Sequence, residues 1–121
     1  MDYKFINMEY LDSVSGGDVE IINEIVVLFR EQSVEIYKEM KSHLEAKNYN
    51  LLGLLAHKAK SSVAIMGMND LADMLKTFEL QAREKKEIQL YESYVERYKN
   101  DTKGAVLELD DIISNRLNNN K

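Results

Sequence analysis

The sequence predicts an all-α protein, an up-and-down antiparallel four-helix bundle with a short capping helix at its N-terminus. The composition favours helices, because the 121 residues include no proline and only five glycines, whereas good helix formers such as Leu, Glu, Lys and Ala are plentiful. Hydrophobic residues also recur every three or four positions along four stretches that are separated by short polar breaks. Short connections between helices make neighbours antiparallel, so the pattern predicts one bundle over residues 1–121.

The first elements are a short helix and a break. Residues 8–12 can form one or two turns, for which Asn7 is a suitable N-cap. Residues 15–17 (Ser-Gly-Gly) then interrupt the chain, and Asp18 is a suitable N-cap for the next helix.

The first long helix is predicted over residues 19–46, because one of its faces is apolar at helical spacing. The residues of that face are Ile22, Ile25, Val26, Phe29, Ser33, Ile36, Tyr37, Met40 and Leu44. A second helix is predicted over residues 51–66, with Gly67 placed to end it in a left-handed C-cap.

Asn69 is expected to cap the third helix, over residues 70–83, whose inward face is Leu71, Met74, Leu75 and Phe78. The last and longest helix is predicted over residues 88–117. One face of this helix is formed by residues three or four positions apart, most of them apolar: Ile88, Tyr91, Val95, Tyr98, Thr102, Ala105, Leu109, Ile112 and Arg116. Gly104 interrupts this helix at a cost of about 1 kcal/mol relative to Ala, so some bending or fraying is expected there.

The composition also excludes several classes of function. A net charge of −5 argues against a nucleic-acid surface. No apolar run is long enough for a membrane span, and residues 1–4 lack the basic start of a signal peptide. Cysteine is absent, which excludes disulfides and thiol catalysis. We therefore expect a cytoplasmic protein that binds neither nucleic acid nor membrane.

The second predicted helix carries an unusual set of residues around His57. At about 100° per residue, the core stripe of this helix is Leu52, Ala56, Ala59, Val63 and Met66. His57 falls on roughly the opposite side and should face solvent. Its neighbours on the same face are Gly53, Lys60, Ser61 and Ala64.

The small neighbours leave the His57 ring accessible, and Lys60 adds a positive charge on the same face. Small side chains around a histidine allow another protein to approach its ring, and a lysine on the same face can neutralise an anion built on that ring. Transfer of a phosphoryl group to a ring nitrogen needs both, because it depends on positioning and on screening the charged oxygens. The set therefore provides what phosphoryl transfer requires, with His57 as the candidate acceptor and Lys60 as its candidate electrostatic partner.

At these residues the chain resembles the histidine-containing phosphotransfer (HPt) domains. Their central motif reads roughly His-x-Leu-Lys-Gly-Ser-Ser/Ala, with a further glycine ten positions after the histidine. His57, Lys60 and Gly67 match in place, whereas Ala59 stands where Leu is usual and Ser61 where Gly is usual. Ser61 adds bulk but also a hydroxyl that can hydrogen-bond a phosphoryl oxygen, and the sequence does not decide between these effects.

The resemblance implies a phosphorelay carrier rather than an autonomous enzyme. The partners would be receiver domains of response regulators and a hybrid histidine kinase. A receiver phosphoaspartate would pass its phosphoryl group to His57, which would hand it to the aspartate of another receiver. The chain would need no cofactor, since Mg²⁺ would belong to the receiver, and we expect a monomer. The partner-binding residues would be Gly53, Leu54, Lys58 and Ala64.

Other interpretations of the same residues differ in what His57 does. The main one is an HPt-like helical adaptor that binds receivers without phosphotransfer. Leu54 is either a docking anchor or the edge of the core stripe. The other histidine, His43, is expected to be an ordinary solvated side chain. Metal binding is not expected, because the two histidines lack the carboxylate spacing of metal-binding bundles.

Overall fold

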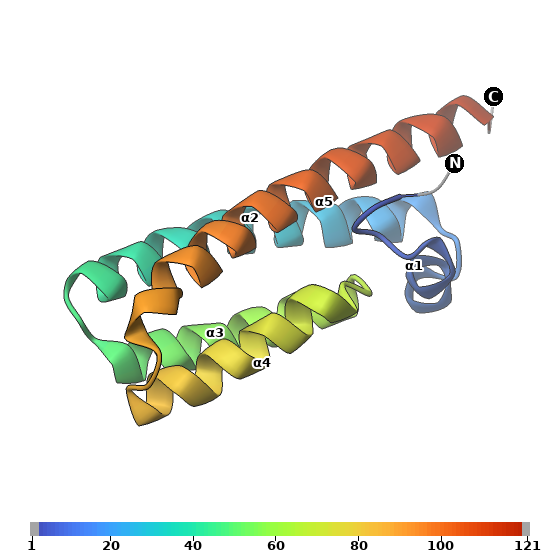
Figure 1. Cartoon of the computed structure of the whole chain (residues 1–121). Coiled ribbons are helices and arrows are strands. Elements are labelled where there is room, and N and C mark those ends of the chain that lie inside the picture. The colour runs from blue at the N-terminus through green and yellow to red at the C-terminus, as the bar shows by residue number, and fades with distance from the viewer. Residues whose placement is uncertain (1–2, 120–121) are drawn as a thin grey trace.

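The structure, a computed structural model, describes residues 3–119 and is all-α over this part of the chain, as the sequence predicts. Figure 1 shows the helices in two layers, with α2 beside α5 and α3 beside α4, while α1 lies across one end. The elements are α1 (Met8–Ser15), α2 (Val19–Glu45), α3 (Tyr49–Ile65), α4 (Asn69–Glu84), the 3-10 helix η1 (Ile88–Leu90) and α5 (Tyr91–Asn119). The predicted antiparallel bundle with a short N-terminal helix is therefore confirmed.

The core is built from the predicted apolar faces. Every residue predicted on the inner face of α2 is buried or half-buried, and so is every one predicted on that of α4. The predicted face of α5 is buried from Tyr91 to Ile112, but Ile88 is 41% exposed. The prediction for Ile88 is wrong because this residue lies in η1, before the regular helix begins at Tyr91.

Side-chain caps confirm two of the three predicted helix starts. The Asn7 side chain accepts a hydrogen bond from the backbone N–H of Tyr10, and the Asp18 carboxylate accepts one from that of Glu20. The prediction for Asn69 is wrong. Asn69 is itself the first residue of α4, and the preceding Met68 makes no side-chain cap.

Gly67 connects α3 to α4 in the predicted left-handed conformation, with φ of +75°. A Cβ at this position would also lie 3.2 Å from Cβ of Asn7 and 3.3 Å from Cδ1 of Tyr10. The glycine therefore allows both the turn and the close approach of the N-terminal helix.

Gly104 has a role that the sequence did not reveal. The α5 helix is continuous through Gly104, so the expected fraying does not occur. A Cβ here would collide with Cε2 of Phe5, so the Phe5 ring occupies the place of the missing side chain. The Glu108 carboxylate holds the same segment by accepting hydrogen bonds from the backbone N–H groups of Lys4, Phe5 and Ile6.

Within residues 3–119, no helix has the length and hydrophobicity needed to cross a membrane.

Candidate site around His57

His57 lies in the middle of α3 and faces outward. The core stripe of the helix packs inward as predicted, which leaves the His57 side chain 56% exposed. The ring is half covered rather than free, because its Nδ1 approaches a residue of the neighbouring helix α4.

The residue that covers the ring is Glu79. His57 Nδ1 lies 3.1 Å from Oε1 and 3.2 Å from Oε2 of Glu79. The Glu79 side chain is only 7% exposed. A carboxylate buried to this extent needs hydrogen-bonded or charged partners, and one of them here is the candidate nucleophile.

Two cations also contact the same carboxylate. Arg83, four residues further along α4, places Nη2 2.8 Å from Glu79 Oε2. Lys60 places Nζ 3.5 Å from Glu79 Oε1. The sequence predicted Lys60 beside His57, and the structure brings it there, but its ammonium group contacts Glu79 in the described state.

The cations hold Glu79 in its ionised form. Burial raises the pKa of the Glu79 carboxyl, but the hydrogen bond from His57 and the charges of Arg83, His57 and Lys60 outweigh it, so that the net pKa lies below its ordinary value. An ionised carboxylate can only accept hydrogen bonds. The proton between the two groups is therefore on His57 Nδ1, and whenever the ring is neutral its lone pair is on Nε2.

Gly53 does not lie where the sequence placed it. It is buried against α4, so the expectation that it lies on the exposed face beside His57 is wrong, whereas its role in partner binding stays a prediction. A Cβ at Gly53 would lie 3.3 Å from Cγ of Arg83 and 3.4 Å from the Glu79 carbonyl oxygen. The reason is the helical rotation: a residue four positions before His57 is turned by about 40° from it, here toward α4.

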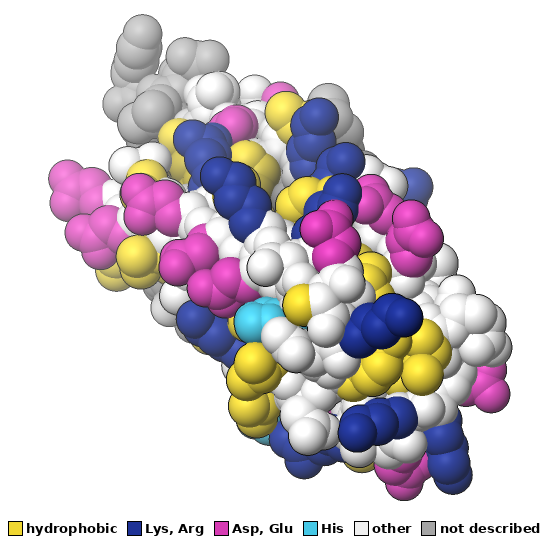
Figure 2. Space-filling model, turned by 90° about the vertical axis from the view of Figure 1, so that its left-hand side faces the viewer, with side chains coloured by type: hydrophobic (Ala, Val, Ile, Leu, Met, Phe, Trp, Pro, Cys, Tyr) yellow, Lys and Arg dark blue, Asp and Glu magenta, His cyan; other side chains and the backbone are white. Residues whose placement is uncertain are grey.

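The other predicted site residues lie on the accessible side of α3. Leu54 is 57% exposed, so it is not part of the core stripe. Lys58 and Ser61 are exposed and Ala64 is half-buried. Figure 2 shows hydrophobic side chains lying between basic and acidic ones on the face that it views. His43, by contrast, is half-buried near the end of α2.

Sequence reasoning missed Glu79 and Arg83, although a signal for both was present. The inward face of α4 comprises Leu71, Met74, Leu75, Phe78 and Ala82. Glu79 falls inside this apolar pattern, four residues after Leu75, and a carboxylate on a buried face requires a partner. Arg83 at i+4 is a partner that the sequence alone supplies.

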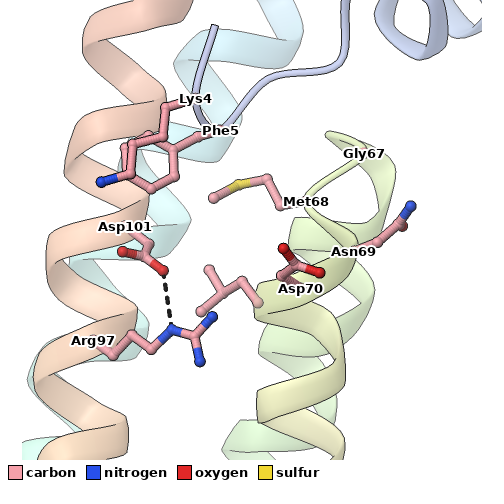
Figure 3. A pocket seen from close by; sticks show the side chains of 9 residues that line it. Lys4, Phe5, Gly67, Met68, Asn69, Asp70, Arg97 and Asp101 are labelled. Atoms are coloured by element: carbon pink, nitrogen blue, oxygen red, sulfur yellow. Dashed lines mark hydrogen bonds and ion pairs between the residues drawn. The ribbon is translucent and has the colours of Figure 1, made fainter.

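A separate hollow lies away from this site. It has a volume of about 600 Å³ and lies between the N-terminal segment, the start of α4 and α5 (Figure 3). Its lining includes Lys4, Asp70 and Arg97, and Arg97 is paired with Asp101 at 3.2 Å. None of the predicted site residues lines it.

Comparison with known proteins assigns the family. The family model of the Hpt domain matches residues 24–117, a span that contains α3 and α4 completely. The chain therefore belongs to the Hpt domain family, as the motif around His57 suggested. The family consists of phosphocarrier modules that take part in two-component phosphorelays together with receivers and kinases. Searches of the curated proteins and of the solved structures gave no match.

Proposed function

We propose that this chain is a phosphorelay carrier in which Nε2 of His57 accepts a phosphoryl group from the phosphoaspartate of a receiver domain and passes it to another receiver. The observation that supports this proposal most directly is the pair formed by His57 and Glu79. In the neutral ring this pair leaves Nε2 without a proton, and no hydrogen bond to Nε2 is found within residues 3–119.

The transfer needs no prior proton movement. The Nε2 lone pair attacks phosphorus, the bond from phosphorus to the aspartyl oxygen breaks, and the receiver aspartate leaves as a carboxylate. The proton stays on Nδ1, so the ring gains positive charge while it is bonded to the Glu79 carboxylate. Glu79 thus stabilises the charge that develops on the ring, as an ionised acceptor does for an imidazolium.

Lys60 is the group best placed to meet the phosphoryl oxygens. Its ammonium contacts Glu79 at a distance longer than a direct hydrogen bond, and the side chain is long and flexible. The incoming phosphoryl group brings negative charge, and Lys60 would move toward it. Ser61, exposed one turn after His57, offers a hydroxyl on the same side.

The partner would dock on the accessible side of α3. Leu54 supplies exposed apolar area, and Lys58 a positive charge for an acidic receiver. Mg²⁺ would be supplied by the receiver. We place the carrier in the cytoplasm and expect it to act as a monomer.

A phosphotransfer assay tests this function. The purified chain is mixed with a phosphorylated receiver and Mg²⁺, and acid-labile, base-stable phosphate is measured on the wild type, on His57→Gln and on His43→Gln as the matched control. Label on the wild type and on His43→Gln, but not on His57→Gln, is expected. If several receivers bind but none transfers phosphate, the chain is an adaptor and the proposal is wrong.

A further inference from the structure

The site consists of four side chains, those of His57, Lys60, Glu79 and Arg83. The two cations among them do not approach Glu79 equally closely. Arg83 and Glu79 belong to the same helix at a spacing of i,i+4 and meet at 2.8 Å. Lys60 reaches Glu79 from the other helix at 3.5 Å. The two cations also contact different carboxylate oxygens, Oε2 and Oε1 respectively, and Oε1 is the oxygen closest to His57 Nδ1.

Gly53 explains how Arg83 reaches this position. The aliphatic part of Arg83 lies over Gly53, where a Cβ would come within 3.3 Å of its Cγ. Such a contact is tighter than most Cβ contacts, so an alanine at position 53 would require the Arg83 side chain to shift by a few tenths of an ångström. A glycine inside a helix is destabilising relative to Ala. Here the missing side chain leaves room for Arg83 to lie closely against α3.

We infer that Arg83, accommodated by Gly53, is a positioning residue that keeps Glu79 in place under His57, while Lys60 is the exchangeable cation that leaves Glu79 for the phosphoryl group. This division rests on the proposed function for its Lys60 part only. The Arg83 part concerns the unphosphorylated protein.

The site needs two cations with different roles because the charge of Glu79 is buried. If a single cation neutralised this carboxylate, its departure toward a phosphoryl group would leave a buried charge unpaired, at a high cost. With Arg83 fixed at Oε2, Glu79 stays paired and ionised when Lys60 moves. Glu79 then continues to accept the hydrogen bond from Nδ1 throughout the transfer, so the tautomer of His57 does not change during the reaction.

The test is the tautomer of His57, read from the ¹⁵N chemical shifts of the ring nitrogens in the full unphosphorylated chain. The wild type should show the Nδ1–H form. Arg83→Gln should shift the population toward the Nε2–H form by roughly tenfold, as for a charge-assisted hydrogen bond that loses its geometry. Gly53→Ala should shift it in the same direction but by less, because the new Cβ displaces the Arg83 side chain without removing its charge. Arg83→Lys should restore part of the effect, and Lys60→Gln should leave the tautomer unchanged.

The control is Arg97→Gln, which breaks the i,i+4 pair of Arg97 with Asp101 on α5 and should not change the His57 tautomer. An unchanged tautomer in Arg83→Gln, or an equal shift in Lys60→Gln, would overturn the inference.

The Lys60 part has its own measurement, the lifetime of phosphohistidine. Lys60→Gln should shorten that lifetime several-fold, and an unchanged lifetime would contradict its role. If the wild type accepts no phosphate, the proposed function and the Lys60 part fall together. The tautomer result still decides the Arg83 part.

Discussion

At the scale of single residues, the site is a buried carboxylate that two cations and a histidine share. Glu79 determines which nitrogen of His57 carries the proton, and the cations keep Glu79 ionised. In the proposed mechanism, the atom that accepts the phosphoryl group is therefore selected by a residue on the neighbouring helix.

Glu79 should make the stability of the protein depend on acid pH. Its pKa is lowered in the folded state, so its stabilising contribution is present above its unfolded pKa, about 4.5, and is lost as pH falls through the lower folded value. Urea unfolding of the wild type should thus lose stability over this range, and Glu79→Gln should lose less. The control is Glu92→Gln, a change at an exposed residue of α5. Parallel pH curves for the wild type and Glu79→Gln would contradict the pairing.

Two buried tyrosines should respond differently to loss of the hydroxyl. Tyr98 is fully buried on α5, and its hydroxyl has no hydrogen-bond partner among residues 3–119. The Tyr91 hydroxyl instead donates to the Gln81 carbonyl at 2.8 Å. Tyr98→Phe should leave the free energy of unfolding unchanged or raise it by up to about 1 kcal/mol, whereas Tyr91→Phe should lower it by about 1 kcal/mol. Equal losses in urea unfolding would show that the Tyr98 hydroxyl is paired.

The residues found from sequence are those whose role depends on one helix alone. His57 and Lys60 are neighbours at i+3, so their proximity follows from helix geometry. Glu79 and Arg83 reach the site only through the register of α4 against α3, which is set by side-chain packing along the whole interface. The same register turns Gly53 toward α4 rather than toward the exposed face.

At the scale of elements, the N-terminal segment and α5 form a unit. Phe5 fills the place above Gly104, Glu108 binds the backbone N–H groups of the segment, and Arg116 pairs with Asp12 of α1 at 2.6 Å. These contacts join parts of the chain about 100 residues apart in sequence. Helix propensity describes Gly104 only within its own helix. It therefore could not indicate the contact with Phe5, which lies in the N-terminal segment.

Gly104→Ala tests this unit. In an isolated helix the change would stabilise by about 1 kcal/mol. In this protein the new Cβ would collide with the Phe5 ring, so we expect loss of stability and release of the N-terminal segment. In a Phe5→Ala background the same change should stabilise by about 1 kcal/mol. Urea unfolding of the four proteins gives the coupling energy, and strict additivity would contradict the contact.

At the scale of the whole molecule, the packing of apolar helix faces, rather than His57, holds the bundle together. The core is formed by the apolar faces of the helices, and these faces could be read from three- and four-residue spacing because burial dominates helix placement. Helix starts were less predictable, since Asn69 lies inside α4 rather than at its cap. The cap depends on the geometry of the preceding turn as well as on residue type.

Loss of the histidine should consequently leave the bundle intact. The side chain is half exposed, and glutamine can still donate a hydrogen bond to Glu79. His57→Gln should change the free energy of unfolding by no more than about 0.5 kcal/mol, the range for surface positions. Thermal unfolding followed by circular dichroism checks this, and a loss of several kcal/mol would show that His57 is a structural residue.

The role of His57 is tested most directly by the position of the phosphate on the protein. The chain is phosphorylated by a receiver, and the modified nitrogen is identified by ¹H, ¹⁵N and ³¹P NMR of the intact phosphoprotein. We predict one phosphohistidine, at residue 57, with phosphorus bonded to Nε2 and a proton retained on Nδ1. Phosphate on Nδ1, or on any other residue, would contradict this mechanism.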